Sequence, residues 1–190
     1  NTYNFFALYA NIDGYTVEEN NKVAHADLTE IDRWVLSKLA SLVKEVDGYY
    51  ADYEPTKAGR AIQDFVSDHL SNWYVRLGRK RFWRGEMTAN KKAAYHTLHE
   101  CLLTVSQLMS PIAPFFGEWL YRSVTNQGAS NSVHLTLFPS VSEAAIDPNL
   151  EAAMDLAQRT SSLVHSLRKN HKLKVRQPLG RMLVPVVSKE

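Results

Sequence analysis

The sequence has 190 residues and a mass of 21.6 kDa, which fits one globular domain or one domain with a small appendage. Hydrophobic residues make up 45% and charged residues 22%, which excludes an intrinsically disordered chain, a collagen-like chain and a coiled-coil rod. No apolar run approaches the roughly 20 residues that a membrane-spanning helix needs, so we expect no transmembrane segment and no membrane partner.

The net charge of +2 is the sum of two opposed halves. Residues 1–68 hold 12 acidic and 6 basic side chains, whereas residues 69–190 hold 8 acidic and 16 basic ones. Such an asymmetry is typical of a protein with one side that faces a polyanion. Asn1 already belongs to an apolar helical pattern, so we expect the chain to be part of a longer protein. The single cysteine excludes an internal disulfide and fits a reducing, cytoplasmic setting.

The first half of the chain predicts three helices. The apolar and aromatic residues 2–10 indicate the end of a helix whose start precedes the chain. Thr29 and Asp32 have the spacing of a capping box, and apolar residues then recur at intervals of three and four for about six turns. Pro55 suits the first turn of the next helix. The predicted core stripe of that helix is Ala58, Ala61, Ile62, Phe65, Val66, His69, Trp73 and Leu77.

Helical patterns continue in the second half. Helices are predicted over 90–109 and 114–124, separated by Ser110 and Pro111, because proline disfavours helical geometry in the residue before it. A last helix is expected over 149–170.

Two segments of the second half predict extended structure. Alternation over 133–138, after a polar turn region at 125–132, indicates a short strand or an extended arm. A further strand is expected over 182–187. The predicted fold class is therefore all-α, a helical bundle with a short β-containing C-terminal tail.

The densest chemical signal is the run from Asn72 to Arg84, which holds five cations and no acid. On an α-helix, Asn72, Arg76, Arg79 and Trp83 fall within an arc of about 60°. Arginine pairs with phosphate or stacks on bases, asparagine reads base edges, and tryptophan stacks on unpaired bases. The run therefore favours RNA binding, although an arginine-rich face is more often simply solvated. By the same spacing Trp73 belongs to the core stripe, while Tyr74 and Phe82 point away from it, in directions that allow packing on a neighbouring helix.

A second basic run, Arg168 to Arg176, again places five cations in nine residues. No acidic residue occurs between Leu156 and Lys189. This run is either a second contact for a polyanion or a flexible basic linker after the last helix.

Catalytic and metal-binding patterns are weak. His96, His99 and Cys101 lie close together in the sequence, but Cys101 is on a core stripe and no fourth metal ligand has suitable spacing. The glycines are scattered and form no phosphate-binding loop. We therefore predict no catalytic residue, no metal site and no cofactor in this chain.

Several of these segments resemble the anticodon-binding domain of class I aminoacyl-tRNA synthetases. The matching segments are Asp32 to Ser37, Asn72 to Arg84, Ser110 to Phe115, Ser132 to Thr136 and Lys174 to Leu179, and the segment Asn1 to Gly14 is most similar to the isoleucine-specific enzymes. The resemblance covers nearly the whole chain in the right order.

The resemblance implies a role in holding the anticodon arm of the isoleucine tRNA. ATP, Mg²⁺ and the chemistry of isoleucine attachment would belong to the catalytic domain of a longer parent enzyme, which also carries the editing domain. It further implies a helical anticodon-binding domain over 1–170, with a truncated first helix, and the start of a C-terminal junction subdomain over 171–190. Asn72 and Arg76 match an Asn-x-x-x-Arg motif that the related methionine enzyme uses to read the anticodon. From the charge pattern alone, we extend the predicted tRNA contacts to Arg79, Lys80, Trp83, Arg84, Lys174 and Arg176.

Three alternatives stay open at this point. The chain is also compatible with the equivalent domain of the valine enzyme, and with a helical protein-interaction module that docks through the acidic half, 13–68. A small hydrolase built on Cys101 and a histidine is the third.

Overall fold

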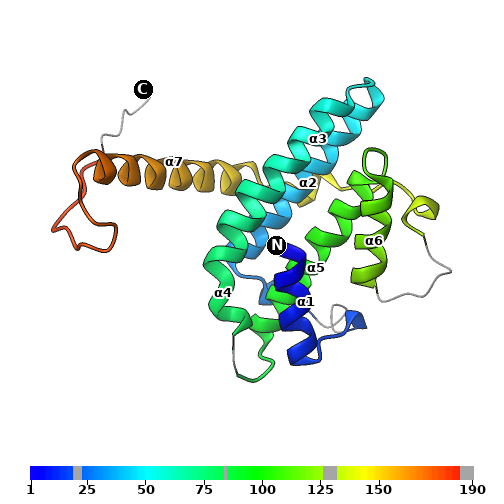
Figure 1. Ribbon diagram of the computed structural model, residues 1–190, viewed down its shortest axis with the longest axis horizontal. Helices are drawn as coiled ribbons and strands as arrows, with labels where there is room; N and C mark the ends of the chain where they lie inside the picture. Colours follow the sequence, from blue (N-terminus) through cyan, green and yellow to red (C-terminus); the bar gives the residue numbers. More distant parts are fainter. Residues whose placement is uncertain (19–22, 84, 126–131, 185–190) are drawn as a thin grey trace. The chain divides into compact units, whose positions relative to one another are not determined.

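The computed structural model describes residues 1–18, 23–83, 85–125 and 132–184, and their regular structure is helical (Figure 1). The α-helices are α1 (Thr2–Asp13), α2 (Glu30–Ala51), α3 (Pro55–Asp64), α4 (Arg76–Phe82), α5 (Ala89–Met109), α6 (Pro114–Thr125) and α7 (Pro148–Asn170). The other helical elements are the π-helix η3 (Phe65–Val75) and the short 3₁₀ turns η2 (His25–Asp27), η4 (Val133–Leu135) and η5 (Glu143–Ala145). The chain divides into two compact units, Asn1–Glu151 and Ala152–Glu190.

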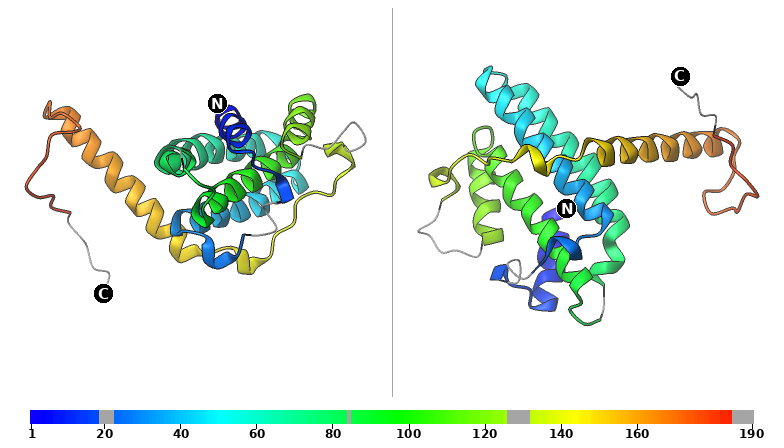
Figure 2. Two further views of the ribbon diagram at one scale, coloured as in Figure 1. Left: turned by 90° about the horizontal axis from the view of Figure 1, so that it is seen from below. Right: turned by 180° about the vertical axis from the view of Figure 1, so that it is seen from behind.

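Helix α5 is the centre of the first unit. It packs against α1, α2, α3, α4 and α6, as the views in Figure 2 show. Twelve of its residues are buried, and α2 adds Trp34, Val35 and Val46, which are fully buried. Burial of an apolar side chain of this size contributes about 1.5–3 kcal/mol relative to exposure. The first unit is therefore a helical bundle with one continuous core.

The helix starts predicted from the sequence are confirmed. Thr29 precedes α2, and its backbone N–H donates to Asp32 Oδ2 at 2.8 Å, as the capping pattern predicts. Pro55 and Pro114 are the first residues of α3 and α6, where the missing N–H of proline costs no hydrogen bond.

Gly117 lets α6 approach the preceding helix closely. A Cβ atom at this position would lie 3.0 Å from the carbonyl oxygen of Ser106 and 3.1 Å from Cα of Ser110. Because both contacts are with backbone or near-backbone atoms, they do not move aside cheaply. The absence of a side chain at Gly117 therefore sets the separation of α5 and α6.

Helices α3, η3 and α4 form one unbroken rod, but its core stripe differs from the predicted one. The π-helix bonds residue i to residue i+5, as in the N–H of Arg76 that donates to the carbonyl of Ser71, and it winds more residues into each turn than an α-helix. The inward face therefore shifts by one residue beyond Phe65. Tyr74 and Phe82 are fully buried, Trp73 is half-buried and Leu77 is 59% exposed, so the predicted core positions of Trp73 and Leu77 are wrong.

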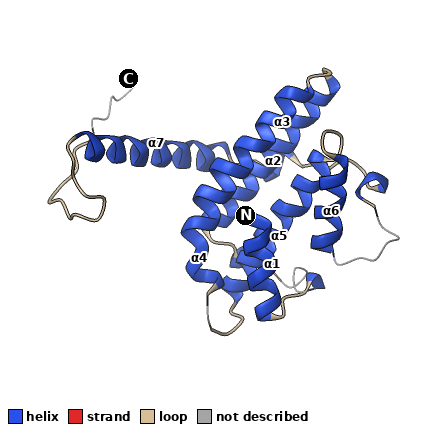
Figure 3. Cartoon of the chain, viewed as in Figure 1, coloured by secondary structure: helices blue, strands red, loops and turns tan. Residues whose placement is uncertain are grey.

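The predicted β-containing tail is also wrong wherever the structure describes it. Figure 3 shows no strand in the described ranges. Residues 133–135 form the 3₁₀ turn η4, because Ser132 Oγ accepts the N–H of His134 and Thr136 Oγ1 donates to the carbonyl of Val133. Such local side-chain bonds compete with strand formation. Residues 182–184 have no regular structure, and the rest of the second predicted strand lies outside the described residues.

Candidate nucleic-acid interface

Four polar side chains lie exposed along the second half of the rod. Asn72 is on η3, and Arg76, Arg79 and Lys80 follow on α4. The sequence has no acidic residue between Asp68 and Glu86 to neutralise them. We call these four residues the basic strip. Its guanidinium, ammonium and amide groups are donors that match phosphate oxygens and base edges.

Trp83 is exposed beside the basic strip but does not share its helical face. Helix α4 ends at Phe82, and Trp83 has an extended backbone with φ −75° and ψ 160°. Trp83 therefore does not belong to the predicted 60° arc, which requires the α-helix to continue through residue 83. Its indole is nevertheless 47% exposed, which leaves it accessible to an unpaired base. Arg84, the next predicted contact, lies outside the described residues.

Arg81 turns inward instead. Its Nη1 lies 2.7 Å from Asp32 Oδ1 and its Nη2 lies 2.8 Å from Asp32 Oδ2. The guanidinium therefore binds the carboxylate in a bidentate manner. Arg81 Nε donates to Asn90 Oδ1 and Nη2 donates to the backbone carbonyl of Asn90, both at 2.9 Å. Asp32 is fully buried, and the Arg81 side chain is 15% exposed.

The Asp32 carboxylate is further held by Thr29 and Tyr74. Thr29 Oγ1 donates to Oδ2 and the Tyr74 hydroxyl donates to Oδ1, each at 2.6 Å. Burial alone raises the pKa of Asp32, but the hydrogen bonds from Arg81, Thr29 and Tyr74 outweigh it and leave this pKa lowered. Burial and the neighbouring carboxylate raise the pKa of Tyr74 well above its ordinary value, so its hydroxyl stays a donor.

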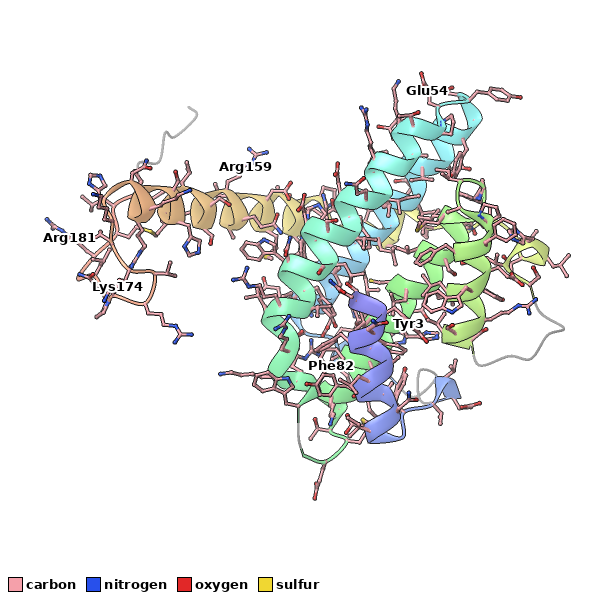
Figure 4. The ribbon with its side chains drawn as sticks, in the orientation of Figure 1. Tyr3, Glu54, Phe82, Arg159, Lys174 and Arg181 are labelled. Atoms are coloured by element: carbon pink, nitrogen blue, oxygen red, sulfur yellow. The ribbon has the colours of Figure 1, made fainter. Side chains whose placement is uncertain are left out.

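The second basic run is arranged differently. Lys174 and Arg176 are exposed in the segment after α7, where Figure 4 shows the Lys174 side chain. Arg168 Nη1 donates to the backbone carbonyls of Lys174, Val175 and Gln177 at 2.8–3.2 Å. One arginine therefore folds this segment back against the end of α7. The other four cations of the run, Lys169, Lys172, Lys174 and Arg176, are exposed.

A nucleophilic site at Cys101 does not fit the structure. Cys101 is fully buried, and burial raises the pKa of its thiol, so the thiol stays protonated. Among the described residues, no group of three or more His, Cys, Asp or Glu side chains is arranged to hold a metal ion. Over the same ranges, no helix is long and apolar enough to cross a membrane.

An apolar groove of about 700 Å³ opens next to the basic strip, with Asn72 at its rim. Leu70, Leu102 and Val105 are among the apolar residues that line it, together with Phe116 of α6. On the same helix Phe115 is 92% exposed and Trp119 is 48% exposed. Sequence patterns did not predict this groove, since it depends on how α1, α3, η3, α5 and α6 assemble.

Two of the residues that hydrogen-bond with the Arg81–Asp32 pair were also not predicted from the sequence. Tyr74 and Asn90 hold Asp32 and Arg81, yet neither was predicted to have such a role. One signal was present: Arg81 lies five positions after Arg76, which places the two on different sides of an α-helix. The π-helix, which brings Tyr74 inward, had no signal in the spacing of apolar residues.

Comparison with known proteins gives one family and several close relatives. Residues 32–183 match the family described as the anticodon-binding domain of tRNA ligase. Isoleucine–tRNA ligase of Cytophaga hutchinsonii is 60% identical over 98% of this chain, and that of Porphyromonas gingivalis is 55% identical over 100%. The enzyme of the same name from Bacteroides thetaiotaomicron is 54% identical over 100%. The chain spans only 16–17% of the length of these relatives.

Proposed function

Because the chain belongs to the family of anticodon-binding domains of tRNA ligases, we propose that its basic strip binds the anticodon arm of a tRNA. The observation that carries this proposal is the exposure of Asn72, Arg76, Arg79 and Lys80 on one rod, in a stretch of sequence with no acid between Asp68 and Glu86. Phosphate contacts from Arg79 and Lys80 would supply affinity, while Asn72 and Arg76 would read base edges. Trp83 would add stacking on an unpaired base.

We further propose that the tRNA is the isoleucine acceptor and that this chain acts within a longer isoleucine–tRNA ligase. This proposal is supported by the 54–60% identity to relatives that carry that name, which favours it over the valine-specific alternative. ATP and Mg²⁺ would be used by the catalytic part of that enzyme, in the cytoplasm. The glycines of this chain are scattered and offer no phosphate-binding loop, so we assign no ATP step to it.

Lys174 and Arg176 are proposed as a second, weaker set of phosphate contacts. They are exposed and lie in a stretch without acids. Their contribution would be electrostatic and would not depend on the anticodon sequence.

A titration with tRNA at several salt concentrations tests the proposal. About five phosphate contacts predict a slope of log K against log salt of about −3.5 to −4.5, between the coefficients for single strands and duplexes. A tRNA with a mismatched anticodon should bind more weakly at each salt concentration. Equal affinity for both tRNAs, or affinity that does not respond to salt, would contradict the proposal.

The groove beside Asn72 and the exposed aromatic side chains of α6 favour a second candidate function, docking of another protein surface. A contiguous exposed apolar face commonly marks such a contact. The predicted docking surface was the acidic half, 13–68. The groove takes only part of its lining from that half, between Gly59 and Ser67, and the rest comes from α1, the later part of η3, α5 and α6. A Phe115→Asp variant tests this second candidate. It should bind tRNA as tightly as the wild type if α6 faces protein, and more weakly if α6 faces RNA.

A further inference from the structure

We propose that Arg81 and Asp32 are positioning residues for tRNA binding: their buried ion pair sets the orientation of α4 and so of the basic strip. This inference rests on the proposed function. Neither residue would touch the tRNA, since Asp32 is fully buried and both arms of the Arg81 fork are occupied within the protein. The basic run thus contains two kinds of cation. Arg76, Arg79 and Lys80 face outward, and Arg81 faces inward.

The ion pair joins the ends of several elements. Asp32 is in the first turn of α2, Arg81 is near the end of α4, and Asn90 is in the first turn of α5. Arg81 contacts both of these residues, and Tyr74 on η3 donates to the same carboxylate. The pair therefore fixes the start of two long helices against the helix that carries the cations.

Helix α4 is the last segment of the rod, and it ends at Phe82. Because helix ends fray, this end of the rod needs contacts with the rest of the bundle. Besides Arg81, its buried contacts come from Gly78 and from Phe82, whose ring lies 5.1 Å from that of Phe5 and 5.0 Å from that of Tyr95. The aromatic contacts hold one end of α4 in place, while the forked ion pair also fixes rotation about the helix axis.

Rotation about this axis decides which side chains face outward. The π-helix already shifts the inward face by one residue, so that Tyr74 and not Trp73 reaches Asp32. A small rotation of α4 would move the guanidinium groups of Arg76 and Arg79 away from a bound backbone. A rigid, correctly oriented helix avoids that ordering cost on binding.

The variant Asp32→Asn distinguishes a role in orienting the basic strip from a purely electrostatic effect on tRNA binding. It removes a negative charge, so attraction alone predicts equal or tighter tRNA binding, whereas positioning predicts binding weaker by about tenfold, the loss expected for one lost contact. Asp47→Asn is the matched control, since Asp47 is exposed on the same helix α2 and the charge change is identical. Asp47→Asn should bind as tightly as the wild type or slightly tighter.

Arg81→Lys and Tyr74→Phe keep the test valid if Asp32→Asn fails to fold. Arg81→Lys retains the charge but loses the fork, and Tyr74→Phe removes only one hydroxyl. Both should weaken binding to the isoleucine tRNA and lower its preference over a mismatched tRNA. A merely structural role would reduce the fraction of binding-competent protein and leave the ratio of the two Kd values unchanged.

Amide hydrogen exchange gives a readout that needs no tRNA. In Arg81→Lys, the amides of 76–82 should exchange faster, while those of α6 keep their wild-type rates. Unchanged exchange in α4, or an unchanged Kd ratio in folded variants, would overturn the positioning role. If the wild-type chain binds no tRNA at all, the proposed function fails, and the exchange result still decides whether the ion pair orders α4.

Discussion

The two basic runs have the same charge density, but their inward-facing arginines contact different kinds of groups. Each places five cations in nine residues and commits one arginine to the protein itself. Arg81 grips a buried carboxylate between packed helices, whereas Arg168 donates to three backbone carbonyls of an exposed segment. Helix α7, which carries Arg168, has no buried residue. Charge density alone therefore does not distinguish a preorganised binding surface from an adaptable electrostatic contact. The group that the inward-facing arginine contacts distinguishes them.

The difference should be largest in stability. Arg81→Ala would leave the Asp32 carboxylate buried without its cation, and we expect the free energy of unfolding to fall by about 3–5 kcal/mol. Arg168→Ala removes only hydrogen bonds to neutral, exposed carbonyls. All four tryptophans lie within residues 34–119, so urea unfolding followed by tryptophan fluorescence reports on the first unit. The fluorescence transition should move for Arg81→Ala and stay in place for Arg168→Ala; equal shifts would remove the distinction between the two runs.

The next difference concerns tRNA binding. Arg76→Ala should weaken binding by roughly 1–3 kcal/mol and reduce discrimination between anticodons, because a base contact is specific. Lys174→Ala should weaken binding to all tRNAs alike and reduce the salt slope by about 1, because a phosphate contact is not specific. Titrations with matched and mismatched tRNA at two salt concentrations distinguish these outcomes. A specificity loss at Lys174 with none at Arg76 would reverse the roles assigned to the two runs.

A glycine pair compares the packing of the two units. Gly117→Ala should destabilise the first unit by about 1–3 kcal/mol, because its Cβ would press against backbone atoms of Ser106 and Ser110. In the second unit, nothing lies within 4 Å of a Cβ at Gly180, so Gly180→Ala should be close to neutral. Thermal unfolding followed by circular dichroism measures both. A destabilisation by Gly180→Ala of the same size would mean that the second unit is packed as tightly as the first.

The smallest expected difference is in the response to acid. The hydrogen bonds to Asp32 lower its folded pKa below the ordinary value of 3.8 despite its burial. Their stabilisation is therefore complete above the unfolded pKa and is lost as pH falls below about 4, through the folded pKa. Asp32→Asn should flatten this part of the pH profile of tryptophan-monitored stability. The segment 156–184 has no carboxylate, so its own structure should respond less over the same range.

Most of the fold follows from local sequence signals. Apolar spacing and the starts at Thr29, Pro55 and Pro114 predicted the α-helical segments, since each depends on a few neighbouring residues. The π-helix did not follow, because its extra residue per turn reflects the packing of Tyr74 and Phe82 and leaves no mark in an α-helical stripe. Of the two structures predicted for 133–138, a short strand or an extended arm, the strand is not formed, because a strand requires a partner, which the described residues do not supply.

The sequence predicts which residues make up the candidate site, but not which of its cations face outward and which faces inward. A run without acids identifies Arg76, Arg79 and Lys80 as exposed cations. It does not say that Arg81 faces inward, since the partner Asp32 lies 49 residues earlier in the chain. Long-range contacts of this kind arise only when α2, α4 and α5 meet.

The most direct test of the account is chemical footprinting of the isoleucine tRNA in complex with the 190-residue chain. Reactivity along the whole tRNA backbone reports which nucleotides the protein covers. We expect protection of the anticodon stem and loop. It should be lost in the loop for Arg76→Ala and retained there for Lys174→Ala. Protection confined to the acceptor end, or a footprint that Arg76→Ala leaves unchanged, would contradict it.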